Sequence, residues 1–175
     1  MKESNDLGVL AQLLQGGGAS PVVTASASSS TIYDVHYRVV VNACAFEIHG
    51  RTDTQGHRRI SANRLKLLQF VAIRPWLLPG MREWADAKGT AQQSLLTQRF
   101  RRGFLGDVVH ERVIDLLIAH GALTRGGVFL VSGESSTTFS KLCADLARDE
   151  LFQDERDTLQ ELLAVRITNA MLEGW

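Results

Sequence analysis

The spacing of hydrophobic residues predicts a helix at the start of the folded body, near residue 33. Tyr37, Val40, Val41, Cys44 and Ile48 recur at intervals that place them on one face of a helix. The run of three valines within this segment also fits a strand, so both structures are considered. The next residues, 50–57, are polar and rich in turn formers, and they predict a loop.

A second, strongly apolar helix is expected after this loop. Ser61 is a suitable N-cap, because its hydroxyl can accept a hydrogen bond from an amide of the first turn. Pro75 should end or kink the helix, since proline lacks an amide hydrogen. The apolar body of this helix consists of Leu65, Leu67, Leu68, Phe70, Val71 and Ile73.

The middle of the chain predicts two more helices separated by breaks. Pro79-Gly80 is read as a break, followed by a short helix over Met81–Lys88 with Trp84 facing inward. A longer helix is expected over Ala91–Phe104. Its apolar side consists of Leu95, Leu96 and Phe100.

Residues 106–133 predict a helix that runs into a β-hairpin. Asp107 is expected to cap a helix over Val108–His120, and Gly121 is a C-terminal stop signal. The apolar side of this helix consists of Val109, Val113, Leu116, Leu117 and Ile118. Two short strands, Ala122–Thr124 and Val128–Val131, flank a tight turn at Arg125-Gly126-Gly127.

These elements predict a mainly α fold with a small β-hairpin, in which residues 31–135 form a winged-helix-like domain and residues 136–175 a C-terminal helical segment. A helix followed by a small hairpin is typical of the end of a winged-helix domain, although a hairpin on an unrelated α+β fold is the alternative. The returning strand is unusually apolar, so we expect it to pack against the protein's own core or a partner. Two C-terminal helices are expected, one over Phe139, Leu142, Cys143, Leu146 and Leu151, the other from Leu159 to Leu172.

The first 30 residues predict a short helix and a flexible linker. An amphipathic helix over Asp6–Gln15 would present Leu7, Leu10, Leu13 and Leu14, and three glycines follow it. Residues 19–30 are rich in serine and alanine, as flexible linkers are. The helix could dock on a partner protein, or the segment could be a frayed terminus.

Charge is distributed unevenly along a chain that is neutral overall. Residues 51–112 contain 12 Lys or Arg and 5 Asp or Glu, whereas residues 134–175 contain 4 and 9. Arginines could contact phosphate groups of double-stranded DNA or a partner, or they could form a solvated face or pair with the acidic segment. The candidate contact residues are Arg58, Arg59, Arg64, Arg99, Arg101, Arg102 and Arg125.

The search for catalytic chemistry favours a protein that is not an enzyme and that holds no cofactor or metal. The sequence contains no HExxH, GxSxG, P-loop or GxGxxG motif. Cys44 and Cys143 fit two buried thiols in a reducing compartment, although a small enzyme that uses Cys44 or a histidine is a third hypothesis. No apolar run approaches the roughly 20 residues of a membrane span, and no signal peptide is recognised, so a cytoplasmic location without membrane contact is expected.

The order of elements resembles the small middle component of ABC-three-component defence systems, the group that includes the Lamassu accessory subunit. The segments that carry the resemblance are YRVVVNACAFEIHG, ISANRLKLLQFVAIRP, the arginine-rich middle and VIDLLIAHGALTRGGVFLVSG, followed by two helices. The resemblance implies antiviral defence as an adaptor between the heads of an SMC/Rad50-like ATPase and an effector nuclease. The alternative is a free-standing winged-helix DNA-binding transcriptional regulator.

Overall fold

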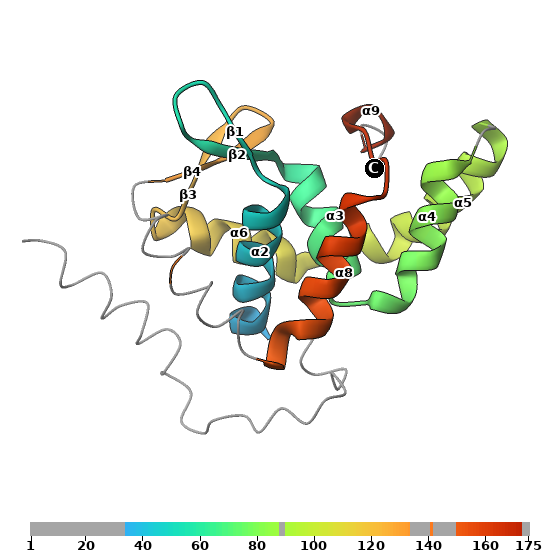
Figure 1. Cartoon of the computed structure of the whole chain (residues 1–175), viewed down its shortest axis with the longest axis horizontal. Coiled ribbons are helices and arrows are strands. Elements are labelled where there is room, and N and C mark those ends of the chain that lie inside the picture. Colours follow the sequence, from blue (N-terminus) through green and yellow to red (C-terminus); the bar gives the residue numbers. More distant parts are fainter. Residues whose placement is uncertain (1–33, 88–89, 134–140, 142–149, 173–175) are drawn as a thin grey trace, which may run out of the picture.

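Helices form most of the protein, and a small antiparallel sheet covers one end (Figure 1). The computed structural model describes residues 34–87, 90–133, 141 and 150–172. This architecture confirms the predicted mainly helical class with a small β-hairpin. The helices are α2 (Val35–His49), α3 (Ala62–Ala72), α4 (Leu78–Asp86), α5 (Thr90–Leu105), α6 (Val108–Ala119), α8 (Gln153–Leu163) and α9 (Asn169–Leu172), with 3₁₀ turns η2 (Pro75–Leu77) and η3 (Glu150–Phe152).

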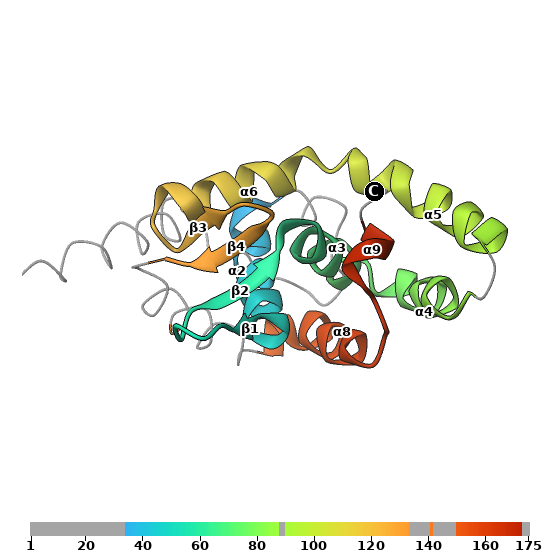
Figure 2. The ribbon, with the colours of Figure 1, turned by 90° about the horizontal axis from the view of Figure 1, so that it is seen from above.

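The core lies where α2, α3, α6 and α8 meet (Figures 1 and 2). The helical reading of the first segment is confirmed, because α2 spans the three valines and buries all of them. Leu65 of α3 and Leu159 and Leu162 of α8 are fully shielded from solvent. The Ser61 cap is also confirmed, since its hydroxyl accepts a hydrogen bond from the Arg64 amide at 3.3 Å.

The sheet contains a strand pair that the sequence did not predict. Its four strands are β1 (Arg51–Thr52), β2 (Arg58–Ser61), β3 (Leu123–Gly126) and β4 (Phe129–Ser132), in the order β1-β2-β4-β3. The loop expected over residues 50–57 is therefore confirmed only for residues 53–57, because Arg51 and Thr52 form β1. Ile60 pairs with Leu130 of β4, far along the chain, and such long-range pairing leaves no mark in local composition.

The second hairpin is displaced from its predicted position. Its turn is Gly127-Val128, where Gly127 has a φ of 64°, a left-handed conformation that glycine adopts readily. Arg125 therefore lies within β3 opposite Leu130 and not in the turn. Leu130 is buried as expected, whereas Val128 is 72% exposed and does not pack against the protein's own core.

Helices α4 and α5 extend away from the core as an arm (Figure 1). Pro79-Gly80 does not break the chain, because both residues lie in the first turn of α4, where a missing amide hydrogen costs no helical bond. Trp84 is buried as predicted, and its Nε1 donates a hydrogen bond to Thr97 Oγ1 at 2.9 Å. Leu95, expected to face inward, is 69% exposed, because the core reaches only the part of α5 near Phe100 and Phe104.

Asp107 joins two elements instead of capping α6. Its side chain makes no capping hydrogen bond, and its Oδ1 accepts a hydrogen bond from Arg38 Nη1 at 2.6 Å in the interior. Asp107 thus occupies the predicted N-cap position of α6, but its carboxylate binds Arg38 and does not form the predicted capping hydrogen bond. Gly121, with a φ of 71°, follows the end of α6 as predicted.

The C-terminal part is broken where one continuous helix was expected. Helix α8 ends at Leu163, and a non-helical stretch leads to α9 because Val165 and Ile167 turn into the core. The helix with Leu7, Leu10, Leu13 and Leu14, the linker and most of the preceding C-terminal helix lie outside the described residues. The structure also does not describe the side chains of Leu96, Arg99 and Arg102.

Candidate functional site

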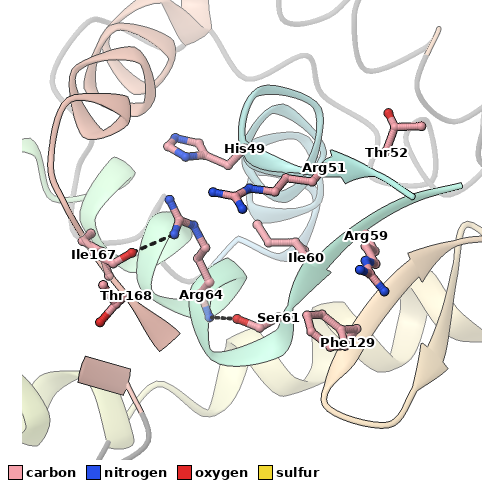
Figure 3. A pocket seen from close by; sticks show the side chains of 10 residues that line it. All are labelled: His49, Arg51, Thr52, Arg59, Ile60, Ser61, Arg64, Phe129, Ile167 and Thr168. Carbon is pink, nitrogen blue, oxygen red and sulfur yellow. Dashed lines mark hydrogen bonds between the residues drawn. The ribbon is translucent and has the colours of Figure 1, made fainter. Parts of the chain in front are cut away.

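A pocket lies at the junction of β1, β2, the start of α3 and the segment before α9 (Figure 3). Its volume is about 470 Å³. Arginines and hydroxyl residues dominate its lining, and none of the lining residues carries a carboxylate. The lining consists of His49, Arg51, Thr52, Arg59, Ile60, Ser61, Arg64, Phe129, Ile167 and Thr168.

The fold brings the arginines to the pocket from three elements. Arg51 begins β1 directly after α2, and Arg59 lies opposite it on β2. Arg64 lies in the first turn of α3, which the Ser61 cap places immediately after β2. The turn from β2 into α3 therefore determines where the pocket forms.

Arg64 is the innermost of the three guanidinium groups. It is partly buried, and its Nη1 donates a hydrogen bond to the backbone carbonyl of Ile167 at 2.9 Å (Figure 3). Burial lowers the pKa of Arg64, and the neighbouring Arg51 lowers it further. Two like charges are thus held close together here.

The outer wall of the pocket combines positive charge with an aromatic ring. The Arg59 guanidinium lies 5.1 Å from the centre of the Phe129 ring, within the range of a cation–π contact. The carboxylate in the loop between β1 and β2, Asp53, accepts hydrogen bonds at 2.9 Å from the amides of Gln55 and His57. Its Oδ1 is therefore occupied by its own loop.

His49 contributes to the pocket as a neutral ring. Its Nε2 lies 2.8 Å from the carbonyl oxygen of Leu159, so this nitrogen carries the proton and donates it. Burial lowers the pKa of His49, although this hydrogen bond opposes the shift. The positive charge of the pocket therefore comes from its arginines.

The predicted basic residues do not form a single surface. Arg59 and Arg64 line the pocket, but Arg58 Nη1 donates a hydrogen bond to the Glu47 carbonyl at 2.9 Å. Arg101 lies exposed on the α5 arm. Arg125 is 3.3 Å from Asp115 of α6.

Arg51 is a pocket residue that the sequence reasoning did not select. The signal that could have found it is its pairing with Arg59 across the β1–β2 hairpin, and this hairpin was not predicted.

Two of the groups weighed as catalytic residues, Cys44 and His110, lie in the interior. Cys44 is 5% exposed, and burial raises its pKa to about 11, so it is a protonated thiol and a poor nucleophile at neutral pH. His110 is 2% exposed, and burial lowers its pKa to about 4. Within the described part of the chain, no group of three His, Cys, Asp or Glu is placed to hold a metal ion.

A second surface feature lies along α5 and the start of α6. Figure 2 shows these two helices following one edge of the molecule. Three large apolar side chains on them face solvent: Leu95 is 69% exposed, Leu105 52% and Val108 69%. We call these three residues the apolar edge.

Comparison with known proteins identifies no relative. No protein-family model matches the sequence, and no curated protein or solved structure matches it either. Of the helices that the structure describes, none is both long enough and apolar enough to cross a membrane.

Proposed function

We propose that this chain is a non-catalytic accessory subunit that docks on a partner protein through the apolar edge. The observation that carries the proposal is the exposure of Leu95, Leu105 and Val108 on neighbouring helices. Leu105 and Val108 lie three residues apart where α5 meets α6, and Leu95 lies earlier on α5. Exposed apolar patches are typical of protein interaction sites. In the resemblance described above, the partners are an SMC/Rad50-like ATPase and an effector nuclease in the cytoplasm.

The order of elements supports a winged-helix-like body. Helix α2, strand β2, helices α3 and α6 and the hairpin β3–β4 follow one another, and β2 pairs with β4 at the centre of the sheet. This succession is compatible with a winged-helix domain if α4 and α5 are an insertion between its second and third helices. The insertion carries Leu95 and Leu105, so it extends the body with a surface suited to assembly.

The exposed side of α6 favours assembly over sequence-specific reading of DNA. In a winged-helix regulator, the helix before the hairpin would lie in the major groove. Here α6 exposes Glu111 and Asp115, which pair with Lys66 and Arg125, and Arg112 is the single exposed basic residue of this helix, so its exposed side carries little net positive charge for phosphate groups. A free-standing regulator is therefore the weaker proposal, whereas DNA contact through the basic pocket is compatible with a larger assembly.

Co-expression with the proteins encoded beside this chain tests the proposal. The triple variant Leu95→Ser, Leu105→Ser and Val108→Ser removes the apolar edge. We expect the wild-type protein to co-purify with the ATPase or the nuclease and the triple variant to lose this association. Because the altered side chains are exposed, the thermal unfolding temperature should change little.

The matched control is Val128→Ser, which removes a similarly exposed valine that lies outside α5 and α6, in the β3–β4 turn. It should retain the partner. A wild-type monomer that binds none of the neighbouring proteins would refute the proposal, and equal loss in the control would refute the assignment of the surface.

A further inference from the structure

The basic pocket is a site of its own, separate from the apolar edge. We infer that it binds a phosphomonoester of nucleotide size. This inference does not depend on the adaptor role, because Arg51, Arg59 and Arg64 lie beside the sheet and the α9 segment, whereas the apolar edge follows α5 and α6 (Figures 2 and 3).

The charge of the pocket is the first argument. Arg51, Arg59 and Arg64 line one cavity, and no carboxylate lines it. In the described part of the chain, none of the three forms an ion pair within 4.0 Å. The Asp53 carboxylate interacts electrostatically with Arg59, whereas the charged group that acts on Arg64 is Arg51. An anion bound between Arg51 and Arg64 would relieve the repulsion between these two positive groups.

The geometry of the donors favours phosphate. A guanidinium group presents paired N–H donors that match the oxygens of a phosphate. Helix α3 begins at the pocket with Ser61, and its first turn contains no acidic residue, so the positive end of its dipole adds to the field. The hydroxyl of Thr168 lies in the same lining.

The apolar part of the lining indicates what the phosphate is attached to. Ile60, Ile167 and the Phe129 ring line the cavity together with the arginines. A cavity of about 470 Å³ exceeds what a lone phosphate needs and falls within the range of small-molecule sites. A phosphate joined to a flat, partly apolar group, as in a mononucleotide, would use both parts of the lining.

Titration calorimetry of the full chain with adenosine 5′-monophosphate, adenosine and inorganic phosphate tests the inference. We expect the monophosphate to bind, and adenosine to bind at least about tenfold more weakly because it forms no charge-assisted hydrogen bonds to the arginines. Inorganic phosphate should bind more weakly than the monophosphate because it cannot use the apolar wall. Equal affinity for adenosine and its monophosphate, or no binding by the monophosphate, would overturn the inference.

Arginine variants assign the binding to the pocket. Arg51→Gln should lower the affinity for adenosine 5′-monophosphate by about tenfold. Because Arg51 is exposed, this variant should fold normally. Arg64→Gln should lower this affinity at least as much. The control is Arg125→Gln, which replaces an exposed arginine on the same sheet but outside the pocket. This variant should bind adenosine 5′-monophosphate with unchanged affinity. An equal loss in Arg125→Gln would show non-specific attraction and overturn the inference.

The phosphate could belong to a free nucleotide or to the end of a nucleic-acid strand. Competition with 5′-phosphorylated and 5′-hydroxyl single-stranded oligonucleotides of equal sequence separates these sources. A phosphorylated strand that competes better than the monophosphate would support the inference with a strand end as the source. Weaker competition by both strands would support it with a free nucleotide as the source. Equal, strong competition by both strands would overturn it, since the terminal phosphate would then contribute nothing.

Discussion

His110 is held neutral between α3 and α6, where its Nδ1 lies 2.5 Å from Gln69 Oε1. Burial lowers its pKa from 6.5 to about 4. Between these two pH values, His110 is therefore mostly neutral in the folded protein and mostly protonated in the unfolded chain. Above pH 6.5 the two states bind protons alike. As the pH falls from about 6.5 to about 4, the free energy of unfolding should decrease by about 3 kcal/mol from this residue.

Urea unfolding across this pH range checks the prediction, with His110→Gln as the comparison. Glutamine cannot titrate, so the variant should be less stable at neutral pH but should lose less stability between pH 6.5 and pH 4.5 than the wild type does. Parallel curves for the two proteins would show that His110 does not cause the pH dependence.

Cys44 gives a second prediction at the scale of a single residue. Its thiol is buried and its pKa is raised to about 11, so a thiol reagent should not label it in the folded protein at pH 7.5. A Cys143→Ser variant leaves Cys44 as the only cysteine. Mass spectrometry should show no alkylation by iodoacetamide without urea and complete alkylation in urea, whereas rapid labelling of the folded variant would contradict a buried, protonated thiol.

Among the elements, the ion pair of Arg38 and Asp107 joins α2 to the junction of α5 and α6. The pair is buried, and Arg74 at the end of α3 lies 3.8 Å from the second carboxylate oxygen. Asp107→Asn removes the charge that compensates these arginines. We expect the free energy of unfolding in urea to fall by about 3–5 kcal/mol, the range for breaking a buried pair.

The exposed pair of Arg82 and Glu161 provides the control for this prediction. Both side chains are about half exposed, so Glu161→Gln should cost less than about 1 kcal/mol. Similar losses in the two variants would contradict a special role for Asp107 in holding the elements together.

The same elements show what the sequence could predict of the fold. Helices α2, α3 and α6 follow from local apolar spacing and from signals such as Ser61 and Gly121, because helical contacts are close in sequence. Strands β1 and β2 could not be predicted, since β2 is stabilised by pairing with the distant strand β4. Asp107 resembled a cap because its partner, Arg38, is distant in the chain.

The candidate site was only partly predictable for a related reason. Charge alone selected Arg59 and Arg64 but also Arg125, which the fold places elsewhere. Arg51 needed the β1–β2 pairing to be recognised. The apolar edge could not be predicted, because helical spacing placed Leu95 on the inward side of its helix and does not indicate where the core ends.

At the scale of the whole molecule, the pocket and the apolar edge are built from different elements, because β1, β2, β4, the start of α3 and the segment before α9 line the pocket, whereas α5 and α6 carry the edge. Sites that are far apart and share no residue should respond independently to substitution. We therefore expect Arg51→Gln to retain the partner in co-purification and the triple edge variant to retain its affinity for adenosine 5′-monophosphate. Loss of both activities in either variant would contradict two separate sites.

The central claim is that the α5–α6 edge is the docking surface of an accessory subunit. Amide hydrogen exchange of the chain, alone and mixed with its proposed partner, an SMC/Rad50-like ATPase, tests this claim most directly. We predict slower exchange on binding over residues 94–108, with little change in the β3–β4 turn around Val128. No protection at residues 94–108, or protection confined to the sheet, would contradict the claim.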